Sequence, residues 1–558
     1  MQTTLETIAR MSVCTTKDLT HEQKSVLRCI TATEAPSCII EAVAGCGKTT
    51  VLLHYLRHAI DVRDRVLFVA FNTTTAQWAR DCVGDNDRVS IQTFHAFAHS
   101  MLPHRQLDPN ATFRVFCDLT AKESQKRKRS HSGNSDDMLS EKQLWTATRR
   151  TIDRMRCSGM PPEMALQQYL PDAQTELETD VLRLAARVLG HIIKDPSHSI
   201  ELDDTVYLAA IDTSLTLPHY QGIVVDEIQD ANGAQLILLH RLLKQSGPSC
   251  RFLAVGDPKQ SIYSFRYAQD AIKGLRRQLH SLQRPVTSLS LSICFRCPQS
   301  VIALARSIQP SIQTTAQASK GTVTIRSNVT LSSLLVVLQR RAVATRRPIL
   351  CIQRFNKPIL RLLWAIYQRS EAMTSIHWLS PSILSDLREH LTAMLGLDRG
   401  EDGDIADLLR TGLVDDATLR SRWKRYKDTR SAHVWDMNPV VRLAIEQSLC
   451  AEWYLFLFDH ISAALPSSLT EQTIVLSTIH CTKGLTFPGV VAIVDYNNFG
   501  NGGSEGPEES HLLYVALTRT TDGLLFIFTE DPYQAVSPYF QVDDIVQTDG
   551  YSHTRDPS

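Results

Sequence analysis

The stretch that most constrains this chain is residues 41–50, EAVAGCGKTT, which follow a short apolar run at residues 38–40. An apolar strand, a glycine turn and a helix in this order, with the spacing A-x-x-x-x-G-K-T, form a P-loop. Gly45 and Gly47 allow backbone N–H groups to point inward around the β- and γ-phosphates, where a Cβ would obstruct them. The positive end of the following helix adds to that field, and Lys48 can reach the same oxygens. The sequence therefore predicts a nucleoside triphosphate site.

Adjacent carboxylates, Asp226 and Glu227, end a later apolar run. Asp226 and the hydroxyl of Thr49 can hold Mg²⁺, and Glu227 can orient and deprotonate the attacking water. Gln260 follows the next apolar run, and at the end of a neighbouring strand it could sense the γ-phosphate. Gln23 opens a helix just upstream of the P-loop strand. It is predicted either to complete a capping box or to read an adenine base.

Apolar runs at residues 65–71 and 89–93 alternate with helical stretches, which indicates a parallel sheet with crossover helices. Ligands of such sheets bind at the carboxyl ends of the strands. Aromatic, basic and small polar residues at those ends suit stacking and phosphate contacts with a single strand of nucleic acid. They are Phe71, Asn72, Thr93, His95, Tyr263, Phe265 and Arg266. Packing or capping is an equally good explanation for each of Phe71, Asn72, Thr93 and His95 on its own.

Composition excludes some classes of protein. The chain has 59 basic and 59 acidic residues, so nucleic-acid contact must come from local basic or aromatic surface. Its 13 cysteines show no framework spacing, which indicates a reducing compartment. Cys294 and Cys297 form a C-x-x-C with no second pair nearby, so no zinc site is expected.

The cellular location is predicted from apolar runs, signal peptide patterns and basic runs in the sequence. No apolar run would span a membrane and no signal peptide pattern is present, so we expect a soluble intracellular protein. The basic run at residues 126–129 is a nuclear localisation signal, a phosphate contact or, as is more common, a solvated charge run. A nuclear location follows from the first interpretation, in a host nucleus if the protein is viral, and the cytoplasm is the alternative.

In their order and wording, these blocks resemble the UvrD/Rep-like superfamily 1 DNA helicases. Residues 68–72, 93–95 and 256–260 are most similar to the F-box DNA helicase branch, although no F-box-like extension is found. Further blocks resemble the family's fourth, fifth and sixth motifs, and they lie at residues 288–296, 473–487 and 508–519. The resemblance covers residues from about 19 to 528, except for two insertions.

The resemblance implies roles for further residues. Phe295 would stack on the adenine, and Arg296 and Arg519 would reach the γ-phosphate. Thr478 and His480 of the fifth motif would join the DNA-binding set. The remaining nucleotide contacts would come from the P-loop, namely Ala44, Gly45, Cys46, Gly47, Lys48, Thr49 and Thr50.

Some positions depart from the family pattern. Thr486 stands where a ribose-holding glutamate is usual, so ribose contact is expected to be weaker or supplied otherwise. Tyr267 stands where a glycine is usual, which allows a different backbone there. Ser510 and His511 stand where an arginine pair is usual. None of these is a P-loop, carboxylate or arginine-finger position, so activity is expected to survive.

These observations predict an α/β fold of two RecA-like P-loop domains with parallel sheets, each carrying a mainly helical insertion, with ATP in the cleft between them. The first domain is expected at residues 1–100 and 201–285, with an insertion at 101–200 that contains a disordered basic loop at about 122–142. The second domain is expected at residues 286–377 and 466–545, with a short insertion at 378–465 and a tail at 546–558.

The predicted activity is ATP-dependent movement on single-stranded DNA, with Mg²⁺·ATP bound, to unwind duplex DNA in replication, recombination or repair. The resemblance alone implies a 3′→5′ direction. One alternative is a translocase that removes bound proteins with little unwinding, which the short second insertion favours. A partner-dependent subunit of a replication complex is disfavoured because no catalytic residue is missing, and an RNA helicase because the motifs match the DNA branch. Expected partners are single-stranded and duplex DNA, with replication or recombination proteins, and the oligomeric state is left open.

Overall fold

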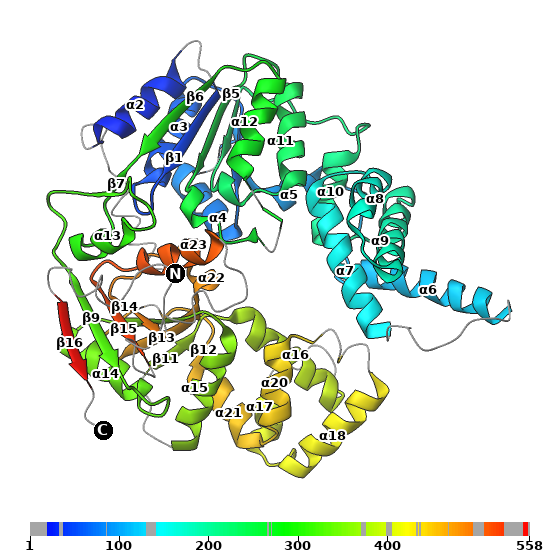
Figure 1. Cartoon of the computed structure of the whole chain (residues 1–558), viewed down its shortest axis with the longest axis vertical. Coiled ribbons are helices and arrows are strands. Elements are labelled where there is room, and N and C mark those ends of the chain that lie inside the picture. The colour runs from blue at the N-terminus through cyan, green and yellow to red at the C-terminus, as the bar shows by residue number, and fades with distance from the viewer. Residues whose placement is uncertain are drawn as a thin grey trace. The chain divides into compact units, whose positions relative to one another are not determined.

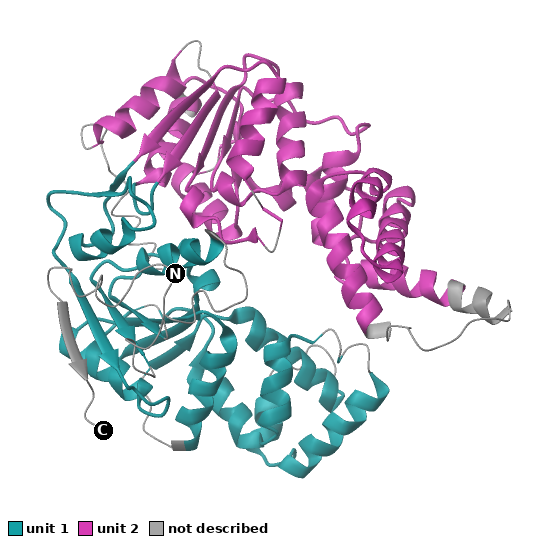
Figure 2. Cartoon of the chain, in the orientation of Figure 1, with its two compact units in different colours: residues 1–13, 43–46, 292–558 teal, residues 14–42, 47–291 magenta. Residues whose placement is uncertain are grey.

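The computed structural model describes residues 19–32, 37–84, 86–129, 141–264, 267–268, 270–369, 375–397, 404–430, 434, 437–466, 468–494, 507–528 and 551–555. The chain forms two compact units, which Figure 2 shows in different colours. Unit 1 comprises residues 1–13, 43–46 and 292–558, and unit 2 comprises residues 14–42 and 47–291. Each unit is built on a parallel sheet of its own.

Among the described residues, the sheet of unit 2 has six strands in the order β3-β2-β4-β5-β1-β6, and neighbouring strands run parallel. Figure 1 labels β1, β5 and β6 of this sheet. The strands are β1 (Ser37–Ala42), β2 (Val66–Ala70), β3 (Val89–Thr93), β4 (Gly222–Val225), β5 (Arg251–Gly256) and β6 (Val286–Leu291). Every residue of β2 and β4 is buried, as expected for a parallel sheet that helices cover on both faces. The helices are α2 (His21–Thr31), α3 (Lys48–Asp61), α4 (Thr73–Val83), α5 (Phe94–Ser100), α10 (Leu202–Ile211), α11 (Gly233–Ser246) and α12 (Ala271–Ser281).

Between α5 and α10 the chain forms a helical insertion with its own apolar core. Its helices are α6 (Ala111–Arg129), α7 (Glu141–Ser158), α8 (Pro162–Tyr169), the 3₁₀ turn η3 (Leu170–Asp172) and α9 (Glu176–Lys194). Arg156 of α7 is buried and pairs with Glu201 at 3.0 Å and Asp204 at 2.7 Å, which joins the insertion to α10. The predicted disordered loop at 122–142 is wrong at its start, because α6 continues to Arg129 through good helix-forming residues. Residues 130–140 lie outside the described part of the chain.

The main sheet of unit 1 has eight strands in the order β12-β11-β13-β10-β14-β15-β9-β16, again with parallel neighbours. The strands are β9 (Thr322–Ser327), β10 (Ile349–Gln353), β11 (Ser375–Trp378), β12 (Ile461–Ser462), β13 (Thr473–Thr478), β14 (Val490–Val494), β15 (Gly523–Ile527) and β16 (Tyr551–Arg555). A two-stranded ribbon pairs β7 (Ile293–Cys294) with β8 (Gln313–Thr314). The helices of this unit are α13 (Gln299–Ala305), α14 (Leu334–Thr345), α15 (Asn356–Arg369), α22 (Ile479–Thr482) and α23 (Pro507–Leu517).

A second helical insertion lies between β11 and β12. It consists of α16 (Pro381–Leu395), α17 (Asp404–Arg410), α18 (Asp416–Thr429), α20 (Pro439–Gln447) and α21 (Ala451–His460). Its buried residues share one apolar cluster with part of the unit 1 sheet. The predicted α/β fold with parallel sheets and helical insertions is therefore confirmed. Among the described residues, no helix combines the length and apolarity needed to cross a membrane.

Three predicted boundaries are wrong. β6, expected to begin the second domain at residue 286, pairs with β1 in the first sheet. β12 joins the second sheet a few residues before the predicted return at 466. β16 lies in the predicted tail at 546–558 and pairs with β9. In each case the strand pairs with a segment far away in the chain. A local sequence pattern carries no information about that partner.

Candidate functional site

The P-loop turn connects β1 to α3, and both of its glycines have positive φ, 69° at Gly45 and 79° at Gly47. Glycine adopts this conformation without the strain that an L side chain would suffer. A Cβ on Gly47 would also lie 2.8 Å from Nε2 of Gln23. The Oε1 atom of Gln23 accepts a hydrogen bond from the backbone N–H of Thr20 at 3.0 Å, so the predicted capping box is confirmed. Gln23 therefore caps α2 and lies against the P-loop glycine, and adenine reading stays a prediction.

The first half of the turn belongs to unit 1 and is held there through main-chain groups. The carbonyl of Gly45 accepts from the backbone N–H of Phe295 at 2.9 Å, and the N–H of Ala44 donates to the Tyr514 hydroxyl at 3.1 Å. A Cβ on Gly45 would lie 2.7 Å from Cβ of Arg296. Within unit 1, the structure thus brings Gly45 together with the fourth-motif residues Phe295 and Arg296. Sequence reasoning missed Tyr514, because a tyrosine in an apolar helix gives no signal of this contact.

Lys48, the first residue of α3, forms an ion pair with Glu227, and its Nζ atom lies 3.0 Å from both carboxylate oxygens. Glu227 follows β4 closely and has a left-handed backbone with φ of 49°. For a residue other than glycine such a conformation costs about 1–3 kcal/mol, and it is most often found at functional sites. The predicted lysine and the predicted general base are therefore in direct contact.

Asp226 is 5% exposed, and its Oδ1 atom accepts from the backbone N–H of Glu227 at 2.9 Å. Burial and the adjacent Glu227 carboxylate raise the pKa of Asp226 to about 7, although Lys48 opposes them. A buried carboxylate beside a second one is short of positive charge, and a hard divalent cation with oxygen ligands supplies it. The Asp226 carboxylate fits Mg²⁺, and the hydroxyl of Thr49, on the first turn of α3, stays a predicted ligand.

Buried hydrogen bonds connect this carboxylate turn to the end of β5. The Nε2 atom of Gln229 donates to Oε2 of Glu227 at 2.7 Å, and its Oε1 accepts from the backbone N–H of Asp257 at 3.0 Å. The Asp257 carboxylate accepts from Nε2 of Gln260 at 2.6 Å. Gln229 lies in the 3₁₀ turn η4 (Ile228–Asp230), and Gln260 ends η5 (Pro258–Gln260). Sequence reasoning found Gln260 and missed Gln229 and Asp257, whose contacts are not visible in any local pattern.

The predicted arginine fingers lie in unit 1. Arg519, which follows α23, is 1% exposed, and its Nε donates to the carbonyl of Val515 at 2.8 Å. Arg296 donates through Nη1 to the carbonyl of Thr518 at 3.0 Å, so it contacts the residue next to Arg519. The Phe295 side chain is 50% exposed, which leaves its ring accessible for stacking. Contact of either arginine with a γ-phosphate stays a prediction.

At the carboxyl edge of the unit 2 sheet, the rings of Phe71 and Tyr263 stack with centroids 5.5 Å apart and an interplanar angle of 21°. Both residues are partly exposed. Asn72 and Thr93 are the N-caps of α4 and α5, and their side-chain oxygens accept backbone N–H groups at 2.7 and 3.2 Å. The capping explanation is thus confirmed for these two. Stacking of a base on the aromatic pair stays a prediction.

The other candidates for DNA contact are less well defined. His95 pairs with Asp203, with Nε2 3.0 Å from the carboxylate oxygen. In unit 1, Thr478 ends β13 with 5% of its surface exposed, and His480 lies partly exposed in α22. Two predicted residues lie outside the described part of the chain, Phe265 and Arg266.

Tyr267, which stands where the family pattern has a glycine, has a left-handed backbone. Its φ is 57°, in the region that favours glycine. Its hydroxyl donates to the carbonyl of Arg150 in α7 at 3.2 Å, which gives the side chain a partner in the helical insertion.

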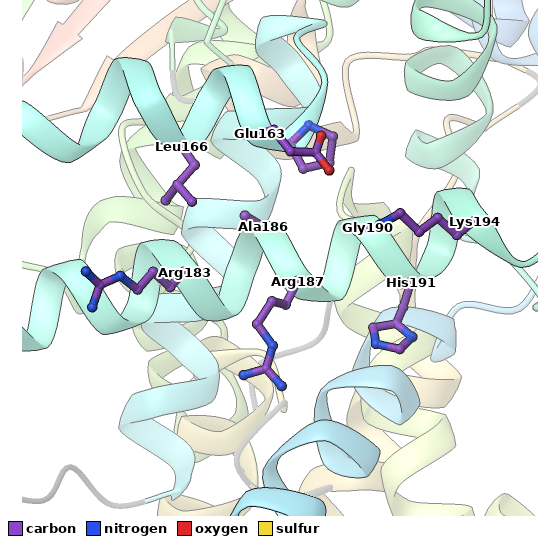
Figure 3. A pocket seen from close by; sticks show the side chains of 9 residues that line it. Glu163, Leu166, Arg183, Ala186, Arg187, Gly190, His191 and Lys194 are labelled. Carbon is purple, nitrogen blue, oxygen red and sulfur yellow. The ribbon is translucent and has the colours of Figure 1, made fainter.

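A groove of about 550 Å³ lies between α8 and α9 (Figure 3). Glu163 and Leu166 line it from α8. Basic side chains line it from α9 at helical spacing, namely Arg183, Arg187, His191 and Lys194. None of the predicted site residues lines this groove.

Comparisons with known proteins match the two ends of the chain to one family. The UvrD/REP helicase N-terminal domain matches residues 19–277, and the UvrD-like helicase C-terminal domain matches residues 458–531. Together these matches cover more than half of the chain. Curated relatives include the ATP-dependent DNA helicases PcrA of Staphylococcus epidermidis, 29% identical over 271 residues, and of Staphylococcus aureus, 28% identical over 270 residues. Each alignment covers 45% of this chain and 35% of the relative.

Proposed function

This chain belongs to the UvrD-like superfamily 1 helicases, and on that premise we propose that it is an ATP-driven DNA helicase or translocase. The resemblance inferred from the motifs is thereby confirmed at the level of the family. The F-box branch, the direction of movement and the pathway served remain predictions.

The observation that carries the proposal is the contact of Lys48 with Glu227 beside the buried Asp226. In the proposed reaction, Lys48 engages the β- and γ-phosphate oxygens and exchanges part of its contact with Glu227 for them. Glu227 then accepts the proton of the water that attacks the γ-phosphate. Asp226 and Thr49 would hold Mg²⁺, which neutralises phosphate charge when bound. We assign Gln260, Arg296 and Arg519 to stabilising the transferring phosphoryl group.

The proposed DNA contact centres on the stacked pair of Phe71 and Tyr263. An aromatic face accepts any base, so the platform supports sequence-independent binding of a single strand. Tyr263 follows Gln260 by three residues. A short segment of chain therefore joins the proposed nucleotide contact, Gln260, to the proposed DNA contact, Tyr263. Movement in the 3′→5′ direction, with replication or recombination proteins as partners, is part of the proposal.

The test is steady-state ATP hydrolysis with and without single-stranded DNA, for the wild type and for Glu227→Gln. We expect DNA to stimulate the rate of ATP hydrolysis in the wild type. In Glu227→Gln the rate should fall by about 10²–10⁴-fold, as when a general base is removed. Glu176→Gln, at an exposed glutamate of α9, is the matched control and should hydrolyse like the wild type. Folded wild-type protein whose hydrolysis is absent or indifferent to DNA would contradict the proposal.

Two assays distinguish a helicase from a translocase. One measures unwinding of a duplex, and the other measures displacement of a protein bound to single-stranded DNA. Strong unwinding supports the helicase. Displacement without unwinding supports the translocase, which the short second insertion favours.

A further inference from the structure

We propose that Gln229 is the positioning residue of the hydrolytic site, and that it fixes the Glu227 carboxylate relative to the β5 segment that carries Gln260. This inference rests on the proposed function, since it assigns a role within the same reaction. The side chain of Gln229 binds the Glu227 carboxylate through Nε2 and the backbone N–H of Asp257 through Oε1, so it would act through Glu227.

The orientation of the Gln229 amide is determined by its partners. The backbone N–H of Asp257 can only donate, so the atom 3.0 Å from it must be the amide oxygen. The amide nitrogen then faces the Glu227 carboxylate at 2.7 Å, and it is also 3.3 Å from Oδ2 of Asp230. A flipped amide would place an oxygen against two carboxylates and a nitrogen against an N–H. The two ends of Gln229 are therefore not interchangeable.

The hydrogen bonds of the Gln229 amide matter because the side chain is buried. Gln229 is 3% exposed, and an amide that loses its partners in such a place is left unsatisfied. The strand end is shaped around it, because a Cβ on Gly256 would lie 2.4 Å from Oε1 of Gln229. Only a residue without a side chain leaves room for the amide at this position.

The Glu227 carboxylate needs such a partner. Its left-handed backbone is unfavourable for a residue with a side chain, so neighbouring contacts must hold it in place. Lys48 is a second partner, but Lys48 also has to engage the phosphates in the proposed reaction. The bond from Gln229 to Oε2 does not depend on Lys48, so the carboxylate stays oriented when the lysine shifts.

The same residue connects Glu227 to the proposed DNA platform. The Ser261 hydroxyl donates to the carbonyl of Gln229 at 3.3 Å, and Asp257 binds the side chain of Gln260. The segment then reaches Tyr263, which stacks on Phe71. A shift of this segment on DNA binding would thus be passed to the carboxylate through Gln229.

The decisive variant is Gln229→Glu in the full chain. It keeps an oxygen for the Asp257 N–H but loses the donor to Glu227 and adds a like charge. We expect DNA-stimulated kcat to fall about 10- to 100-fold, as for groups that orient a reacting residue, while KM for ATP stays within about twofold because the P-loop is untouched. Gln235→Glu is the matched control, since Gln235 is a similarly buried glutamine whose capping role a glutamate can take over. Its kcat should equal that of the wild type.

Two further measurements separate positioning from mere support of the fold. In a Glu227→Gln background, Gln229→Glu should cause no further loss in single-turnover hydrolysis, because its effect passes through Glu227. Gln229→Met removes both the donor to Glu227 and the oxygen that accepts from the Asp257 N–H, without adding charge. It should lower kcat in the same way if the glutamate variant does not fold. A folded Gln229 variant with wild-type kcat, or losses that multiply in the double variant, would overturn the assignment. Wild-type protein without DNA-stimulated hydrolysis would instead refute the proposed function.

Discussion

Gly256→Ala tests the packing on which the Gln229 assignment depends. The added Cβ would lie 2.4 Å from Oε1 of Gln229, 2.9 Å from Cγ2 of Ile228 and 3.2 Å from the backbone N of Gln229. Relieving this overlap in a buried turn costs about 1–3 kcal/mol. Moving Oε1 away also weakens its hydrogen bond to Asp257, worth about 0.5–1.5 kcal/mol. We therefore expect the free energy of unfolding to fall by about 2–4 kcal/mol.

Urea denaturation measures this effect as a lower midpoint at an unchanged slope. Gly190→Ala is the control, because a Cβ at this position in α9 would meet nothing within 4 Å. An alanine inside a helix should stabilise the protein by about 0.5–1 kcal/mol relative to glycine. If Gly256→Ala unfolded at the wild-type midpoint, the close contact between Gly256 and Gln229 would be wrong.

Two other perturbations probe the strand edge. Phe71→Ala removes the partner of Tyr263 and should weaken binding of single-stranded DNA by about 1–3 kcal/mol, as measured by fluorescence anisotropy; an unchanged Kd would exclude the platform. Asp226→Asn tests the raised pKa of about 7, which burial and Glu227 cause. Because the folded protein holds this proton more tightly than the unfolded chain, stability is lost as pH rises from the usual aspartate pKa towards 7. Without Mg²⁺, the variant should therefore be more stable than the wild type above pH 7, by at most about 4 kcal/mol, and equal to it below about pH 4. If the urea midpoints of Asp226→Asn and the wild type did not differ across this pH range, the raised pKa of Asp226 would be refuted.

Local patterns in the sequence were enough to predict the P-loop and the strand ends. Buried strands such as β2 are continuous apolar runs, and the residues after them fall at one sheet edge by the geometry of parallel strands. Lys48, Asp226 and Glu227 could therefore be assigned to one site before any contact was known. The capping box of Gln23 was equally local, because its partner is three residues away.

Interactions between distant segments could not be predicted in this way. β6 has a mixed burial pattern, and its place in the first sheet depends on β1, about 250 residues earlier. The bond from Gln229 to Asp257 joins two turns 28 residues apart, and that from Ala44 to Tyr514 spans 470 residues. Nothing in the local sequence distinguishes these polar residues from others that face solvent.

Movement along DNA is the most direct test of the central claim that this chain is a motor. Single-stranded oligonucleotides of increasing length, with a fluorophore at the 5′ end, would be bound by the protein and mixed with ATP in a stopped-flow instrument. The account predicts that the time to the change in fluorescence grows in proportion to the length of the strand, and that Glu227→Gln abolishes the change. An arrival time independent of length, in protein that hydrolyses ATP, would contradict it.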